Sequence, residues 1–339
     1  MAVTSFLRSV LGKSPAPHLA STSPSMTAPI VNLQTAIKDT SQLSGKQSEG
    51  TFYRFLFAGS HEQELTIPQK LVVDVVRDNL SKKELRMYAV PRLPSIIPKL
   101  LRSLRDPNSS VKDYEAIVNK DPTMSAGVLK LANSVYFNPI GRYIDDIEQA
   151  IVKLGIVGLR SVLSAAVMQP IIQRDSPYFS QTGQRLWSHS LNTAVACELI
   201  GEARNLERFK VYLLGLTHDV GKITLFSELC KQYKLNGDEM PGQNAFIPPM
   251  RKLSAQLSYL IAKDWQLPQE ILTALQEQIQ ITPGTQVSIY GQLLHQANIA
   301  CEAFAFTPTN KRNKLRFIVD EFDLPKNLFS KLEEVSSQL

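Results

Sequence analysis

Three of the five histidines lie in apolar segments whose residue spacing predicts helices. His189 faces the packed side of its segment, because Ala196 and Ile200 follow it by seven and eleven residues. His218 and Asp219 are adjacent at the end of another apolar segment, where helical spacing no longer constrains their directions and both can reach one ion. Imidazole nitrogens and carboxylate oxygens hold hard or borderline divalent ions, and such an ion activates water against a phosphoester. These residues are therefore candidates for metal-dependent chemistry.

Lys222, His295 and Asn298 complete the set of candidate residues. Lys222 lies one turn past His218, where its ammonium group either complements the helix dipole or meets an anionic ligand. Gly221, just before it, is expected to take the left-handed conformation that ends a helix. His295 precedes Asn298 by three residues on a further predicted helix.

The elements that position these residues are all predicted to be helices. After Thr51 nearly every segment has apolar residues at helical spacing, and no run alternates like a strand between hairpin turns. Asp121 and Pro122 are typical of a helix start, and Gly155 is expected to interrupt a later helix. The helices expected around the candidate residues cover 183–204, 206–218, 252–263, 268–278, 286–304 and 325–339, with a loop over 235–249. The fold class predicted from this pattern is all-α.

Composition excludes several other classes of protein. Apolar residues make up 43% of the chain and charged residues 20%, which is typical of a globular protein with a substantial core. The apolar runs are far shorter than the roughly 18–20 residues that cross a bilayer, so we expect no transmembrane segment. Cys197, Cys230 and Cys301 lie far apart with no C-x-x-C pair, which excludes a disulfide framework and a cysteine zinc site. Reduced thiols and a cytoplasmic location are the expectation.

The first fifty residues differ from the rest of the chain. Residues 14–29 are mostly Ser, Pro, Ala and Thr, which bury too little apolar surface to offset the entropy of ordering. We predict a disordered low-complexity tail over 1–50. An organelle transit peptide is the alternative, because bases but no acid occur before Asp39.

The net charge of +6 is concentrated in one stretch between Ser81 and Arg105, where seven bases accompany a single acid, Glu84. The bases of this basic strip are Lys82, Lys83, Arg86, Arg92, Lys99, Arg102 and Arg105. We interpret the strip as a solvated face that can meet an acidic partner. Nucleic-acid binding is less favoured, because Tyr88 is the only aromatic residue among these basic side chains and no nucleic-acid-binding motif is present.

A histidine followed 29 residues later by an adjacent His–Asp pair resembles the layout of the HD metal-dependent phosphohydrolase superfamily. Several segments are similar to the HDOD domain, an HD-related output domain of bacterial signalling proteins. These segments are LPSIIPKLL from Leu93, DPTMSAGVLKLANS from Asp121, IEQAIVKLG from Ile147, LLGLTHDVGKI from Leu213 and WQLPQEI from Trp265. The likeness covers about 85–305 and implies a two-lobed helical domain. The resulting division is a helical extension over 51–84, a first lobe over 85–175, an HD-like lobe over 176–305 and a C-terminal helical extension over 306–339.

The resemblance also implies a site of His189, His218, Asp219 and a closing aspartate, for which this chain has Asn298. An asparagine keeps the shape and an acceptor oxygen but removes a negative charge, which weakens the attraction for a divalent ion. Ser254 and Gln256 likewise stand where related chains often have a histidine and an acid. We therefore favour a degenerate site, a buried hydrogen-bonded network without catalytic residues or a cofactor.

In the alternative, the site holds Mn, Fe, Ni or Zn. The ligands are then His189, His218 and Asp219, with Asn298 and help from His295. The first interpretation predicts a non-catalytic regulatory protein of bacterial signal transduction, which acts through contacts with other signalling proteins or by sensing a ligand such as a nucleotide. The second predicts a metal-dependent phosphohydrolase or phosphodiesterase acting on a nucleotide or cyclic dinucleotide.

Overall fold

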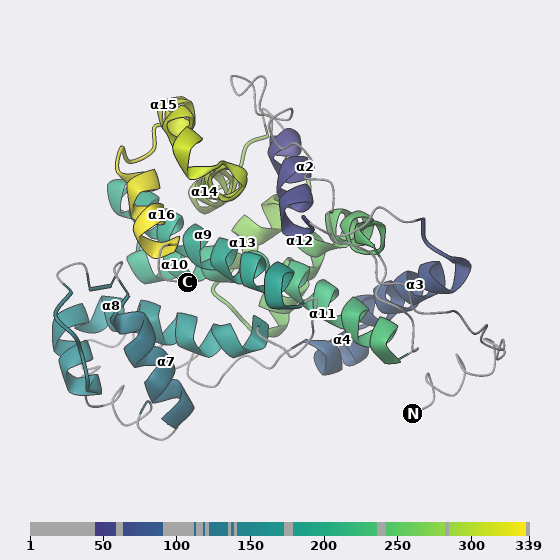
Figure 1. Cartoon of the computed structure of the whole chain (residues 1–339), viewed down its shortest axis with the longest axis horizontal. Coiled ribbons are helices and arrows are strands. Elements are labelled where there is room, and N and C mark those ends of the chain that lie inside the picture. The colour runs from purple at the N-terminus through teal and green to yellow at the C-terminus, as the bar shows by residue number, and fades with distance from the viewer. Residues whose placement is uncertain are drawn as a thin grey trace, which may run out of the picture.

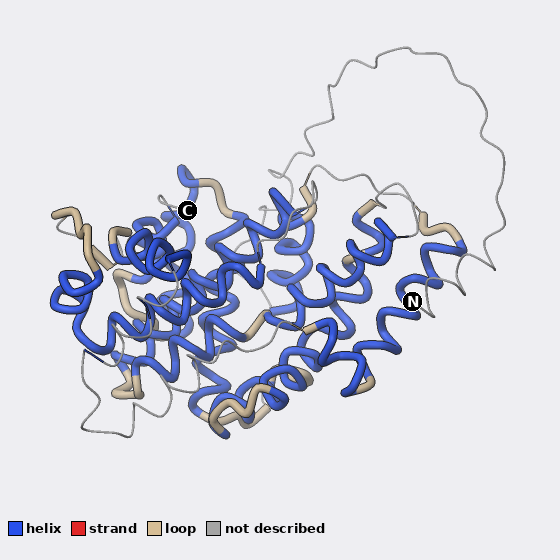
Figure 2. Tube along the Cα trace, turned by 90° about the horizontal axis from the view of Figure 1, so that it is seen from below, coloured by secondary structure: helices blue, strands red, loops and turns tan. Residues whose placement is uncertain are grey.

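The computed structural model describes most of the chain after residue 44. The described residues are 45–58, 64–90, 112, 118, 122–134, 137–138, 141–172, 179–235, 242–281 and 285–336. Within these ranges the regular elements are helices and no strand occurs, as Figures 1 and 2 show. The predicted all-α fold is therefore confirmed for this part of the chain, and residues 1–44 of the tail predicted over 1–50 lie outside it.

The centre of the fold is the pair α9 (Gln184–Ala203) and α10 (Arg208–Thr217). Helix α9 is buried on almost all sides between Leu186 and Gly201, as its apolar sequence predicts. The two helices approach so closely at Gly215 that an added Cβ would lie 2.6 Å from the carbonyl oxygen of Thr193. A glycine at this crossing is what brings the end of α10 next to α9.

Helix α11 (Val220–Leu235) follows the His218–Asp219 turn and crosses α12 (Ile247–Asp264). At this crossing a Cβ on Gly221 would lie 2.3 Å from the carbonyl oxygen of Ser254, and the Gly221 N–H donates to Ser258 Oγ at 2.9 Å. The expected left-handed conformation at Gly221 is wrong, because among the described glycines only Gly141 and Gly155 have a positive φ. Gly221 is instead the point of closest contact between two helices.

The C-terminal elements pack around α9. They are α13 (Gln269–Glu277), α14 (Ile289–Phe306), the 3-10 helix Thr309–Leu315, α15 (Arg316–Phe322) and α16 (Leu328–Ser336). Figure 1 shows α14 on one side of α9 and α8 on the other, in agreement with their contacts. Ser288 caps α14, and Glu277 accepts hydrogen bonds from the Ser288 backbone N–H and hydroxyl at 2.8 Å each. Helix α12 begins at Ile247, inside the predicted loop.

An N-terminal helix, α2 (Gly45–Leu56), packs against α14. It begins at Gly45, so residues 45–50, which the predicted tail included, are helical. Its C-terminal carbonyls are satisfied by the rest of the fold: Arg185 Nη1 donates to Phe55 O at 2.9 Å, and Thr182 Oγ1 donates to Leu56 O at 3.1 Å. Helix α2 is therefore an integral part of the folded chain.

The next two helices are α3 (Ile67–Ser81) and α4 (Lys83–Ala89). Arg86 does not belong to an exposed basic strip, because its side chain is 4% exposed and its guanidinium pairs with Asp264 at the end of α12 at 2.9 Å. The pair joins α4 to α12, and a buried arginine requires such a partner. Lys82 and Lys83 are exposed as predicted. The remaining bases of the strip, Arg92, Lys99, Arg102 and Arg105, lie outside the described residues.

Helices α7 (Pro122–Ala132) and α8 (Ile147–Ile172) pack together, and α8 also contacts α9 and α10. Gly155 interrupts α8 with a φ of 63°, as the sequence predicts. Cys197, Cys230 and Cys301 are buried and free. None of the helices that the structure describes has the length and apolarity needed to cross a membrane.

Candidate functional site

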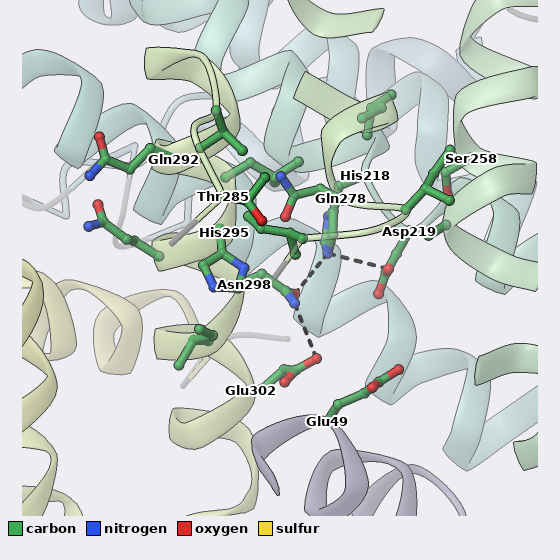
Figure 3. Close-up of a pocket in the computed structure, with 18 of the residues that line it drawn as sticks. Glu49, His218, Asp219, Ser258, Gln278, Thr285, Gln292, His295, Asn298 and Glu302 are labelled. Atoms are coloured by element: carbon green, nitrogen blue, oxygen red, sulfur yellow. Dashed lines mark hydrogen bonds and ion pairs between the residues drawn. The ribbon is translucent and has the colours of Figure 1, made fainter. Parts of the chain in front are cut away.

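Four polar side chains from three parts of the fold converge beside α9. His189 comes from α9. His218 and Asp219 come from the turn between α10 and α11, and Asn298 from α14 (Figure 3). Asn298 Oδ1 lies 3.0 Å from His189 Nε2 and 3.2 Å from His218 Nε2. The two Nε2 atoms are 3.3 Å apart, and each lies 3.5 Å from a carboxylate oxygen of Asp219. We call these four residues the His–Asp cluster.

The tautomer of His218 follows from one backbone contact. Its Nδ1 lies 2.6 Å from the carbonyl oxygen of Gly215, which can only accept a hydrogen bond. The proton is therefore on Nδ1, and Nε2 directs a lone pair into the cluster. Burial outweighs the attraction of Asp219 and lowers the pKa of His218, so the imidazole is neutral.

His189 is the most buried member of the cluster and is 1% exposed. Burial lowers its pKa to about 3, so this ring is also neutral at physiological pH. Its Nδ1 is buried and has no hydrogen-bond partner among the residues that the structure describes. The ring of Phe52, on α2, lies against it with the centroids 4.4 Å apart. Helix α2 thereby places an aromatic ring against His189.

Asp219 also pairs with a buried lysine. Its Oδ2 lies 2.8 Å from Lys222 Nζ, one turn into α11. Burial alone would raise the pKa of Asp219, but the attraction of His218, Lys222 and His189 outweighs it and lowers that pKa. Lys222 Nζ further lies 5.3 Å and 5.4 Å from the ring centroids of Phe52 and Tyr53. The lysine therefore connects the cluster to α2.

The cluster fits a divalent cation by geometry and by the direction of its lone pairs. Two ligands about 2.1 Å from an ion, at angles of about 90–109°, lie roughly 3.0–3.4 Å apart. The separations of 3.0–3.5 Å in the cluster match this range. His218 Nε2 and Asn298 Oδ1 are both acceptors, yet they face each other at 3.2 Å. His189, His218 and Asp219 thus form a possible metal site, in which an ion would activate water and shield phosphate charge.

Two predicted site residues differ in their relation to the cluster. Lys222 joins it through Asp219, whereas His295 only lines the cleft beside it, on the turn of α14 before Asn298 (Figure 3). Burial lowers the pKa of His295, so it too is neutral. It contributes none of the contacts that join the four cluster residues.

Glu302 is a functional candidate that the sequence reasoning missed. It is 2% exposed, lies one turn beyond Asn298 on α14, and its Oε1 accepts a hydrogen bond from Asn298 Nδ2 at 3.2 Å. The signal in the sequence was the spacing of four residues, which places both side chains on one face of a helix. Glu302 is therefore a second carboxylate in contact with the cluster, through Asn298.

A cleft of about 1240 Å³ opens from the cluster and is lined by residues of α2, α11, α12, α13, α14 and α15. His218, Asp219 and Asn298 line its inner end, as Figure 3 shows. Uncharged polar side chains line much of the remainder, namely Ser254, Ser258, Gln278, Thr285, Gln286, Gln292 and Gln296. The cluster is thus accessible to a small polar ligand from the cleft, to which Glu49 of α2 also contributes.

The class of protein is defined by a family match. The HDOD domain model matches residues 90–281, more than half of the chain, so the chain belongs to the HDOD domain family. The matched range contains His189, His218 and Asp219, whereas α2 and α14 lie outside it. The resemblance seen in the sequence is confirmed.

Similar solved structures agree with this fold. An HDOD domain protein of unknown function from Geobacter sulfurreducens has 21% identity and a TM-score of 0.54, over 80% of this chain and 99% of that one. A Shewanella amazonensis SB2B protein described as a "putative metal-dependent phosphohydrolase" has 18% identity and a TM-score of 0.57, over 80% and 98%. An uncharacterized Treponema pallidum (strain Nichols) protein is 23% identical over 199 residues, 56% of this chain and 37% of that protein. The chain thus spans little more than a third of that relative.

Proposed function

We propose that this chain is a regulatory HDOD protein that senses a ligand at the His–Asp cluster and transmits its binding through helix α2, without hydrolysing a phosphoester. The observation that carries the proposal is the cover that α2 places on the cluster. Phe52 lies against His189, and Lys222 lies between Asp219 and the rings of Phe52 and Tyr53. Helix α2 lies outside the range that the family model matches.

Electrostatics couples the cluster to α2. A cation that binds beside Asp219 competes with Lys222 for the same carboxylate and repels the ammonium group. Displacement of Lys222 weakens its contacts with the two rings of α2. Binding at the cluster and docking of α2 therefore oppose each other, and the coupling is reciprocal. Competition with Lys222 also keeps binding weak and reversible, as sensing requires.

Hydrogen–deuterium exchange on the full chain tests this proposal. Addition of Mn²⁺ is expected to increase exchange over residues 45–56, and His218→Ala is expected to abolish the response. Bis(p-nitrophenyl) phosphate is expected to remain intact under the same conditions. Unchanged exchange in α2 while Mn²⁺ binds would contradict the coupling.

A second candidate function is a metal-dependent phosphohydrolase acting on a nucleotide or cyclic dinucleotide. The donor separations of 3.0–3.5 Å favour it, and the similar protein from Shewanella amazonensis carries a description of this kind. Metal content after purification without chelator, combined with turnover of cyclic dinucleotides, tests it. Stoichiometric metal and turnover, both lost in His218→Ala, would replace the regulatory proposal.

A further inference from the structure

Glu302 is a buried carboxylate whose side chain is directed at the cluster. Long charged side chains are almost never buried without partners. Glu302 accepts from Asn298 Nδ2 at 3.2 Å and lines the inner end of the cleft. In Figure 3 it lies directly beyond Asn298, on the side away from His295. The residue therefore contacts the cluster through the one member that departs from the family layout.

The contact determines which way the Asn298 amide points. A carboxylate only accepts hydrogen bonds, so the amide must direct its NH₂ group to Glu302. Its oxygen is then directed at His189 Nε2 and His218 Nε2, at 3.0 Å and 3.2 Å. An ionised partner also polarises the amide, which increases the negative charge on that oxygen.

The charge of Glu302 is close enough to act on the cluster. Its Oε1 lies 3.2 Å from Asn298 Nδ2, and Asn298 Oδ1 lies 3.0 Å and 3.2 Å from the two imidazole Nε2 atoms. When ionised, a buried carboxylate at this separation attracts a cation bound beside Asn298.

We propose that Glu302 is the second carboxylate of the cation site: it directs Asn298 Oδ1 at the ion and provides, one helical turn away, the negative charge that an aspartate at position 298 would have provided. Glu302 is thus a positioning residue, in the way that carboxylates behind metal-binding histidines orient those ligands. This inference rests on the proposed binding of a ligand at the cluster.

Mn²⁺ titration of the full chain tests the inference, with calorimetry and the electron paramagnetic resonance of bound Mn²⁺ as readouts. Glu302→Gln keeps the shape but removes the charge, and is expected to weaken Mn²⁺ binding by roughly 10–100-fold. The double variant Asn298→Asp/Glu302→Gln returns the charge to position 298 and is expected to restore binding. The matched control is Glu321→Gln, which removes an acid from the same cleft and is expected to leave binding unchanged.

Three outcomes would overturn the inference. The first is unchanged Mn²⁺ binding in Glu302→Gln. The second is that Asn298→Asp increases the affinity for Mn²⁺ equally in the wild-type chain and in Glu302→Gln. The third is the absence of Mn²⁺ binding by the wild-type chain. A purely structural role of Glu302 would not produce rescue by Asn298→Asp. If Glu302→Gln does not fold, two other variants test the inference. Glu302→Asp keeps the charge and must bind Mn²⁺ more tightly than Glu302→Ser, which removes it. Weakened binding in Glu302→Gln with no effect of Mn²⁺ on α2 would support this inference and reject the regulatory proposal.

Discussion

The two sides of the His–Asp cluster are built in different ways. The inner wall, formed by α9, α10 and α11, is joined by backbone contact at Gly215 and carries His189, His218 and Asp219. The outer wall is formed by α2 and α14. Its Asn298 is a member of the cluster, and its Phe52 contacts His189. The inner wall lies within the matched family range and the outer wall outside it. The inner wall thus positions the imidazoles and Asp219, whereas the outer wall contributes the amide of Asn298 and the ring of Phe52.

The largest effect is expected from breaking the buried ion pair of the inner wall. Asp219→Asn leaves the Lys222 ammonium buried without its anion, which is expected to lower the free energy of unfolding by roughly 3–5 kcal/mol. Urea denaturation measures the loss. The double variant Asp219→Asn/Lys222→Met removes both charges and is expected to recover most of it. A double variant as unstable as Asp219→Asn would contradict this account of the pair.

The helix crossing at Gly215 is expected to give the next largest effect. In Gly215→Ala the new methyl group meets the Thr193 carbonyl oxygen and the Ala194 backbone, which cannot move aside cheaply. The free energy of unfolding is expected to fall by about 2–3 kcal/mol. Gly127→Ala is the control, because its Cβ meets Ala166 at an ordinary 3.5 Å. Equal stability of the two variants would mean that the inner wall is not held by backbone contact.

Lowering the pH is expected to destabilise the chain through the two buried histidines of the inner wall. Burial lowers the pKa of His189 to about 3 in the folded chain, below its value of 6.5 in the unfolded chain. Between these pH values the unfolded state therefore binds more protons than the folded state. Stability is then lost as the pH falls, by about 2 kcal/mol between pH 7 and pH 5 for this residue. His218, whose pKa is also lowered, acts in the same direction. Urea denaturation across this range measures the slope, and His189→Gln is expected to reduce it. A pH-independent stability would contradict the burial of neutral imidazoles.

The smallest effect is expected on the outer wall. Phe52→Leu keeps most of the buried volume but removes the ring that contacts His189 and Lys222, at a cost of about 1 kcal/mol. Hydrogen–deuterium exchange over residues 45–56 is expected to rise at the same time. Arg54→Ala, at an exposed position of α2, is the control. If Phe52→Leu costs more than Gly215→Ala, the contrast between the two walls is wrong.

Local patterns were enough to predict much of the fold. The helical periodicity, the Pro122 start of α7 and the Gly155 break in α8 are determined by neighbouring residues, and the structure confirms them. The conformation of Gly221 and the exposure of Arg86 were predicted wrongly, because each depends on a partner distant in the sequence, Ser254 or Asp264. The domain boundaries and the cytoplasmic location stay predictions.

The candidate site divides in the same way. The order and spacing of His189, His218 and Asp219 determined, without any structure, the resemblance to the HD layout, because residue types and spacing are properties of the sequence itself. Only the tertiary structure decided that Phe52 covers His189 and that Glu302 supports Asn298. Charge and access at a buried site depend on which side chains come together in three dimensions, and α2 reaches His189 from more than a hundred residues away.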